Sequence, residues 1–173
     1  MAFSLYDATV PSWQQILGSV AGLIDKAQAH GLEHQLAPAS IIETRLAKDM
    51  LPFGYQVKST VAHSIGAIDG VRKGVFSPDK SAWADSFEGL RDMLSGAAER
   101  LAALDPAEIN AFEGGAMRFE MGSYRIDFTA ENFLLSFSLP NFYFHATTAY
   151  DILRAQGLVI GKKDFVGRLR KKD

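Results

Sequence analysis

The sequence predicts an all-α fold in which four long helices form a bundle. The strongest indication is the segment 129–157, which is apolar on nearly every side and has no formal charge between Glu131 and Asp151. A helix of that kind must be surrounded by other helices. Three further segments repeat apolar residues at helical spacing, whereas a short segment before the last helix alternates apolar and polar residues. These observations favour a helical bundle with one small β-hairpin.

The first half of the chain predicts two of the long helices. The first is expected over 11–31, starting at a proline that suits a first helical position and ending at a glycine. A short helix over 39–45 follows a connector. The second long helix is expected over 52–72, with Asp49 as its cap. Its apolar stripe lies opposite a stripe of small and polar residues that includes His63, so we expect both faces to be buried.

The second half predicts a helix, a hairpin and the central helix. The third long helix is expected over 82–104, where an Asp-Pro pair stops it. Residues 117–121 and 124–128 alternate around a Gly-Ser pair and predict a β-hairpin. The fourth long helix, 129–157, contains Pro140. Because proline removes one bond of the helical ladder, we expect a kink just before His145.

The bulk properties predict one domain over 1–173, with residues 1–6 and 168–173 frayed. A hydrophobic content of 47% and a charged content of 22% are ordinary for a globular protein. The net charge of −2 gives no reason to expect nucleic acid as a partner. The basic tail 162–172 is expected to be a solvated end.

The absence of cysteine excludes disulfides, thiolate ligands and a cysteine nucleophile, and it fits a reducing cytoplasm. The first residues have neither the basic start nor the uninterrupted apolar run of a signal peptide. Residues 132–150 contain several polar side chains and a proline, so we do not expect them to span a membrane. The prediction is a cytoplasmic protein.

A family resemblance is carried mainly by the fourth helix. The matching residues are Leu139-Pro140-Asn141-Phe142-Tyr143-Phe144-His145, Thr147-Thr148-Ala149-Tyr150 and Ile152-Leu153-Arg154, supported by Arg45-Leu46-Ala47, Asp49-Met50, Gln56-Val57, Gly161-Lys162 and Asp164-Phe165. Over residues 3–167 the chain resembles the DinB-like (YfiT-type) four-helix-bundle superfamily, whose members are expected to be metalloenzymes. More closely, it resembles an uncharacterised bacterial domain-of-unknown-function family within it. The resemblance implies an up-down-down-up bundle with a short hairpin before the last long helix.

The resemblance also implies a metal bound by three histidines. One comes from helix two and two come from an H-x-x-x-H pair on one face of helix four. His63 falls at the helix-two position. His145 matches the second histidine of the pair, because a Leu-Arg pair and a helix-ending glycine follow it at the family's spacing. Asn141 then stands where the first histidine is expected, so the candidate metal site is His63, Asn141 and His145.

The departure at Asn141 makes this a degenerate site. An amide oxygen is a weak, neutral ligand, and two histidines alone hold Zn²⁺ or Ni²⁺ poorly. Asp49 or Gln56 could complete the ligand set; otherwise the divalent metal is expected to be weakly bound or absent. In the alternative interpretation, the three side chains form a hydrogen-bonded polar cluster inside the bundle.

Two functions remain open at this point. A metal-dependent transferase or hydrolase would hold a small molecule in the cleft between helices two and four, although no catalytic residue can be named. A non-catalytic bundle would bind a small apolar ligand or a partner protein, which the twelve phenylalanines favour. A homodimer is expected in both cases, because several apolar residues of helix one and of the tail lack an obvious internal partner.

Overall fold

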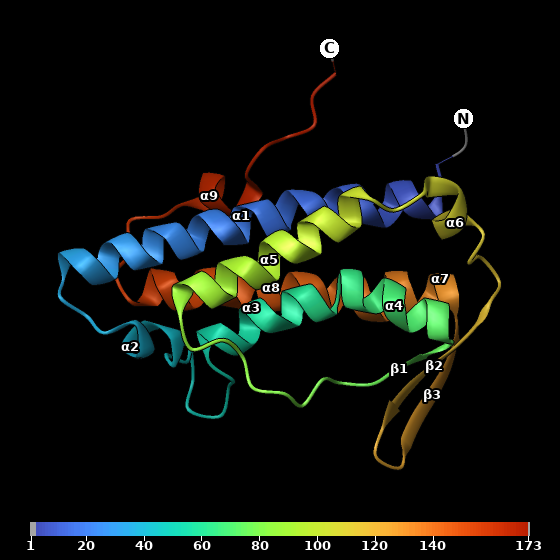
Figure 1. Cartoon of the computed structure of the whole chain (residues 1–173), viewed down its shortest axis with the longest axis horizontal. Helices are drawn as coiled ribbons and strands as arrows, with labels where there is room; N and C mark the ends of the chain where they lie inside the picture. Colours follow the sequence, from blue (N-terminus) through green and yellow to red (C-terminus); the bar gives the residue numbers. More distant parts are fainter. Residues whose placement is uncertain (1–2, 173) are drawn as a thin grey trace.

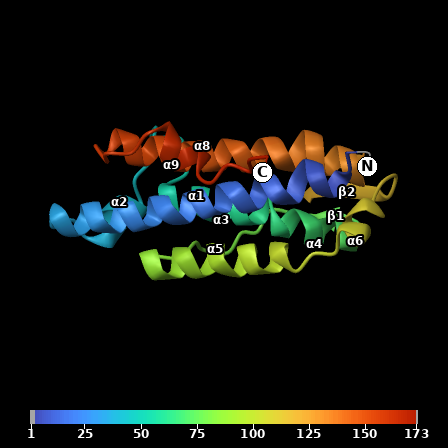
Figure 2. The ribbon, with the colours of Figure 1, turned by 90° about the horizontal axis from the view of Figure 1, so that it is seen from above.

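The computed structural model describes residues 3–172, which are mainly helical (Figure 1). The helices are α1 (Leu5–Glu33), α2 (Pro38–Ile42), α3 (Phe53–Ala62), α4 (Ile65–Lys73), α5 (Phe87–Ala102), α6 (Pro106–Asn110), α7 (Ala130–Asn132), the π-helix η1 (Phe133–Ser138), α8 (Leu139–Ala155) and α9 (Lys162–Val166). The strands are β1 (Val75–Phe76), β2 (Ala116–Met121) and β3 (Tyr124–Thr129). Figure 2 shows α1 and α3–α4 between α8 on one side and α5 on the other. The largest side chains fully buried between these helices include Trp13, Phe53, Phe133 and Phe142.

Helix α1 begins earlier and ends later than the sequence predicts. Ser4 caps it in a capping box with Asp7, and this local signal starts the helix at Leu5 with Pro11 inside it. Leu5 and Tyr6, which the sequence predicts to be frayed with the rest of residues 1–6, are the first residues of α1. Residues 1–2 and 173 lie outside the described part of the chain. The helix also continues past Gly31. This glycine is buried against α2, where an added Cβ would lie 3.2 Å from Ile41 Cδ1.

The predicted helix over 52–72 is two helices, α3 and α4, which are separated at His63 and Ser64. Ser64 Oγ donates to Thr60 O at 2.8 Å, while the Ser64 N–H is 3.2 Å from Val61 O. The side chain thus takes the carbonyl that the backbone N–H would use in a continuous α-helix, and the ladder breaks. Asp49 is exposed and does not cap α3, which has no side-chain cap.

The third long helix is shorter than predicted. Ser86 caps α5, because its Oγ accepts the Gly89 N–H at 3.1 Å, and residues 77–86 before it have no helix or strand. α5 ends at Ala102, before the Asp-Pro pair that the sequence predicts to stop it. That pair instead starts α6, where Asp105 accepts the Ala107 N–H at 2.9 Å. Pro106 occupies the first position of α6, which needs no N–H donor.

The helix predicted over 129–157 is divided into α7, the π-helix η1 and α8, and η1 directly precedes α8. The kink expected at Pro140 stays a prediction. A π-helix bonds residues five apart and inserts an extra residue into the helical turn. Pro140 is the second residue of α8. The backbone N–H that it lacks is therefore missing at the point where the π-helix changes into the α-helix. Gly157 follows α8 with a φ of 89°, which is the left-handed conformation of a helix-ending glycine.

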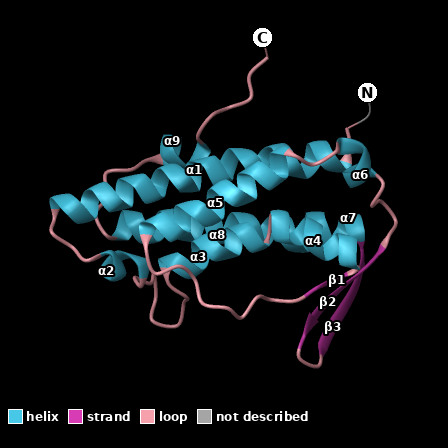
Figure 3. Ribbon diagram, in the orientation of Figure 1, coloured by secondary structure: helices cyan, strands magenta, loops and turns pink. Residues whose placement is uncertain are grey.

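The predicted hairpin is present, and a third strand extends it to a small sheet (Figure 3). β2 and β3 pair antiparallel, with Met121 opposite Tyr124 at the turn. β1 pairs parallel to β2, with Phe76 opposite Phe119. Phe119 and Phe76 are buried, so this face of the sheet joins the core. The prediction of an all-α fold with one hairpin therefore missed the third strand, β1, because a strand of two residues carries no alternation.

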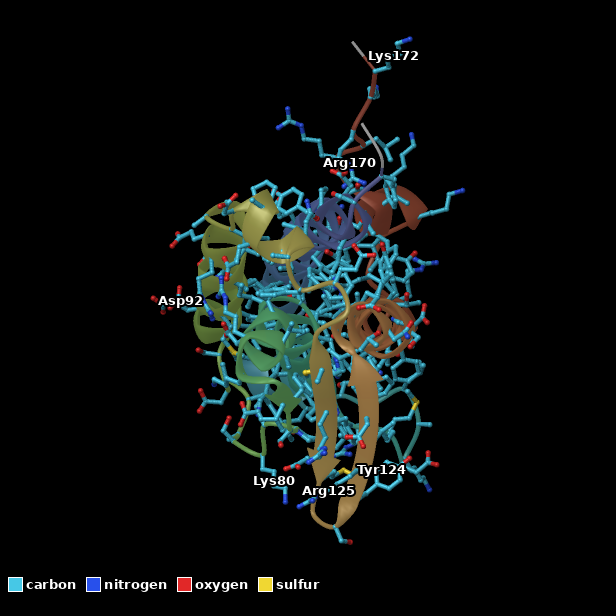
Figure 4. All side chains as sticks on the ribbon, turned by 90° about the vertical axis from the view of Figure 1, so that its right-hand side faces the viewer. Lys80, Asp92, Tyr124, Arg125, Arg170 and Lys172 are labelled. Atoms are coloured by element: carbon cyan, nitrogen blue, oxygen red, sulfur yellow. The ribbon has the colours of Figure 1, made fainter. Side chains whose placement is uncertain are left out.

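After α8 the chain turns back, and α9 packs along α1. Gln15 Nε2 donates to Val166 O at 2.8 Å, and Lys26 pairs with Asp164 at 2.6 Å. Residues 167–172 have no regular secondary structure, and Lys172 lies beyond the bundle in Figure 4.

The apolar residues of α1 that suggested a homodimer are buried within the chain, as are Leu158 and Ile160 of the tail. Val159 and Leu169 stay exposed. The dimer remains a prediction with less support than the sequence suggested. Within residues 3–172, no helix combines the length and the apolar character needed to cross a membrane.

Candidate functional site

The structure brings the two predicted histidines together between α3 and α8. His63 is the residue that ends α3, at the break before α4, and His145 lies on α8. Their ring centres are 5.7 Å apart and their planes differ by 15°. Asn141 is one helical turn before His145, and all three side chains line one cavity of about 180 Å³.

The cavity has an aromatic side and a polar side. Phe76, Phe119 and Phe137 bring rings from the sheet and from η1. The polar side includes, besides the predicted residues, the charged pair Lys58 and Asp79. Sequence analysis did not identify this pair, because Asp79 comes from a connection without periodicity.

Gln56 determines which ring nitrogen of the neutral His145 side chain carries the proton. Its Nε2 donates to Leu51 O at 2.7 Å, so its Oε1 is the atom that faces His145 Nδ1, also at 2.7 Å. An amide oxygen only accepts, so Nδ1 of the neutral ring carries the proton and Nε2 has a free lone pair. Gln56 therefore does not act as a ligand in this arrangement; it orients His145.

Ser138 has the same effect on His63, although over a longer distance. Its Oγ donates to His63 O at 3.0 Å and lies 3.4 Å from His63 Nδ1. Because its single proton is used on the carbonyl, the hydroxyl can only accept from the ring, and Nε2 of His63 is again the unprotonated nitrogen. Ser138 is the last residue of η1, so it joins the π-helix to the break between α3 and α4.

The Nε2 atoms of both histidines reach accessible space. Neither makes a hydrogen bond inside the described part of the chain. In residues 3–172, the fully enclosed side-chain polar atoms that lack a partner belong to Trp13 and Thr129, not to these histidines. The lone pairs therefore face the cavity or its opening.

Burial keeps both rings neutral. It lowers the pKa of His63 to about 3, with a smaller contribution from His145 beside it, and it lowers the pKa of His145 to about 4. At neutral pH the site thus offers two electron-pair donors. Asn141 adds a third acceptor, because its Nδ2 donates to Phe137 O at 2.7 Å and leaves Oδ1 without a hydrogen bond in the described residues.

Lys58 adds no unpaired positive charge to the cavity. Its side chain is 6% exposed, and its ammonium lies 3.0 Å from Asp79 O, 3.0 Å from Ser81 Oγ and 3.1 Å from Asp79 Oδ2, with Ser81 O as a further acceptor. Hydrogen bonds from Ser81, and then Lys58, lower the pKa of Asp79 to about 2, so the carboxylate is ionised and balances the lysine.

The ligand set does not extend to further acids. Asp49 is exposed and does not line the cavity. Among residues 3–172, no three or more His, Cys, Asp or Glu side chains come close enough to share an ion. Any metal at this site would therefore depend on the two imidazoles and on the Asn141 amide oxygen.

The fold belongs to the DinB class of helical bundles. The solved structure of a DinB family member protein from Shewanella denitrificans is similar, with a TM-score of 0.79 and 26% sequence identity over 98% of this chain and 95% of that one. Residues 5–166 match the model of the domain of unknown function DUF1993, so the chain belongs to this family. None of the curated proteins matches the chain. The resemblance inferred from the sequence, a family of unknown function with a DinB-like fold, is confirmed.

Proposed function

We propose that His63, His145 and Asn141 bind a divalent transition metal such as Zn²⁺ or Ni²⁺ weakly, beside a cavity that accepts a small molecule. The observation that carries this proposal is that both imidazoles are neutral and turn an unprotonated Nε2 toward accessible space. Two imidazoles on one tetrahedral ion, with bonds of about 2.0–2.1 Å, place their ring centres roughly 5 Å apart. The 5.7 Å between the ring centres of His63 and His145 is near that value.

The surroundings of the two rings also suit a metal. Metal-binding histidines usually donate their other ring N–H to a neighbouring acceptor, and Gln56 and Ser138 are such acceptors. Lys58, a cationic side chain that lines the cavity, is balanced by Asp79. Nitrogen and oxygen donors of this kind suit Zn²⁺ and Ni²⁺.

A metal with only three protein ligands keeps an open position, where it lowers the pKa of a bound water or thiol. The matching reaction class is a transferase or a hydrolase. Within such a site, His63 and His145 would bind the ion, and the phenylalanine side of the cavity would hold the apolar part of a substrate.

Titration of protein purified without a histidine tag tests the proposal. We expect isothermal calorimetry with Ni²⁺ and Zn²⁺ to give one ion per chain. Asn141→His should tighten this binding by about tenfold or more, about 1.4 kcal/mol, because it replaces an amide oxygen by an imidazole. His145→Ala should remove the binding, and the exposed His34→Ala serves as the matched control. Absence of metal uptake by the unmodified chain would overturn the proposal.

A second candidate function is the binding of a small apolar ligand without a metal, with the histidines as a structural polar cluster. The observation that favours it is the aromatic side of the cavity, where the Phe119 and Phe137 rings are 4.8 Å apart. Native mass spectrometry of the purified protein should then show a bound small molecule. Ala62→Leu, which fills the cavity, should remove it, whereas His145→Ala should not.

We also propose a bundle topology, a single domain, a cellular location and an oligomeric state. The chain directions in Figure 1 support an up-down-down-up bundle. The packing of α1 against α5, α8 and α9 supports one domain. The absence of cysteine supports a cytoplasmic location. The exposed Val159 and Leu169 support a homodimer, which light scattering at working concentration tests.

A further inference from the structure

The connection from β1 to α5, residues 77–86, forms part of the wall of the histidine cavity. Pro78 and Asp79 line this cavity together with His63 and His145. The connection has no helix or strand, and none of its residues is buried. In Figure 1 it runs beneath α3 and α4, from the sheet to the opposite end of the bundle where α5 begins.

Lys58 holds one end of this segment. Its buried ammonium binds the Asp79 carboxylate and the backbone carbonyls of Asp79 and Ser81, as well as the Ser81 hydroxyl. Every hydrogen-bond partner of this ammonium in the described residues belongs to the segment. Lys58 thus acts as a clamp between α3 and the segment.

Trp83 holds the other end. Its indole N–H donates to Glu43 Oε1 at 2.8 Å, and its ring meets Tyr55 edge-on with ring centres 6.0 Å apart. The ring also covers Gly54, where an added Cβ would lie 2.5 Å from Trp83 Cδ1, so only glycine leaves room for it. Tyr55 in turn meets His145 edge-on, with ring centres 5.8 Å apart. The packing site of Trp83 is therefore next to the histidine site.

A second cavity, of about 300 Å³, neighbours the histidine cavity. Lys58 and Asp79 line both cavities, together with Ala62 and Phe76. Segments with few buried contacts open at low free energy, and the exposed residues 77–86 fit that description. Displacing the segment would therefore open the histidine cavity and connect it to the second one.

We propose that residues 77–86 form a lid at the histidine cavity, fastened by Lys58 and Trp83, whose opening widens the access of a small molecule to the two Nε2 atoms. The lid rests on the proposed function only in taking this cavity as the binding site. Lids of this kind control entry and exclude water once a ligand is bound.

The rate at which diethyl pyrocarbonate modifies each histidine, read by peptide mass spectrometry, tests the lid. Lys58→Met removes the clamp and should raise the rates at His63 and His145 by about tenfold or more, because hydrogen bonds to a charged group hold the closed form. The exposed His34 is the internal control. Lys26→Met, which loses an exposed ion pair with Asp164, is the matched variant and should change none of the rates.

Acrylamide quenching of tryptophan fluorescence covers the case in which Lys58→Met does not fold. Trp13 is fully buried, so quenching reports Trp83. Ser81→Ala removes one acceptor of the clamp and should increase quenching while the circular dichroism spectrum stays unchanged. Unchanged histidine rates in Lys58→Met, or unchanged quenching in Ser81→Ala, would overturn the lid. Protection of the histidines by added Ni²⁺ is a separate measurement, so failure of the metal proposal would show independently.

Discussion

Lowering the pH from 7 to 5 is expected to destabilise the fold by roughly 4 kcal/mol through His63 and His145 alone. Burial lowers the pKa of these rings to about 3 and about 4, whereas histidine in an unfolded chain has a pKa of about 6.5. Between these values the unfolded chain binds protons that the folded chain does not. Acid therefore favours the unfolded state, and the stability that the neutral rings allow is fully present only above about pH 6.5.

The size of this destabilisation follows from the pH range, for each histidine, between its pKa in the folded and in the unfolded chain. Each histidine changes the free energy of unfolding by about 1.4 kcal/mol per pH unit while it is protonated only in the unfolded chain. From pH 7 to pH 5 this amounts to roughly 2 kcal/mol for each ring. The loss levels off once the pH falls through the folded-state pKa values, first that of His145 at about 4 and then that of His63 at about 3.

Urea unfolding at closely spaced pH values measures this slope. His145→Gln should lose about 1.4 kcal/mol per pH unit of the dependence between pH 6 and 5, because one proton fewer is bound on unfolding. His34→Gln changes an exposed histidine and should keep the slope of the unmodified protein. If His145→Gln and His34→Gln had the same slope, the buried neutral state of His145 would be refuted.

Three substitutions test other parts of the structure. Ser138→Ala should lower the free energy of unfolding by about 1–3 kcal/mol, because it leaves the His63 carbonyl without its donor; an unchanged urea midpoint would contradict this. Gly54→Ala should displace Trp83, lower the free energy of unfolding by about 1–3 kcal/mol and shift the tryptophan emission to the red. An unshifted spectrum would contradict the packing of Trp83 on Gly54. Gly22→Ala, which meets open space inside α1, should raise stability by about 0.5–1 kcal/mol in thermal unfolding, and a loss would be unexpected.

The long helices could be predicted because their burial follows from periodic sequence patterns. Residues 132–150 carry no formal charge, and the structure places α8, which contains most of them, against α1 and α3. The break at Ser64 could not be predicted from the pattern, because the apolar stripe continues through it. It depends on one hydroxyl group that competes with the backbone for the Thr60 carbonyl.

The candidate site also contains residues that the sequence could indicate and residues that it could not. That His63, Asn141 and His145 lie together could be predicted, because the resemblance assigns them positions on two facing helices. That they form a metal site stays a proposal. Lys58 and Asp79 could not, because their contact joins a helix to an irregular connection. The sequence allows Gln56 as a metal ligand, but in the structure its amide oxygen accepts from His145, a role that only the three-dimensional arrangement reveals.

Both irregular helical segments supply backbone carbonyls that hold side chains of the site. In a continuous α-helix, His63 O would accept the Ala67 N–H, but that N–H donates to Ser64 O, and Ser138 Oγ binds His63 O instead. In η1, Phe137 O accepts a hydrogen bond from Asn141 Nδ2 at 2.7 Å. The break and the π-helix therefore orient the amide of Asn141 and the ring of His63. Functional sites often coincide with π-helical turns. At the break between α3 and α4 the reason is local, because an ideal helix would keep the His63 carbonyl in its own ladder.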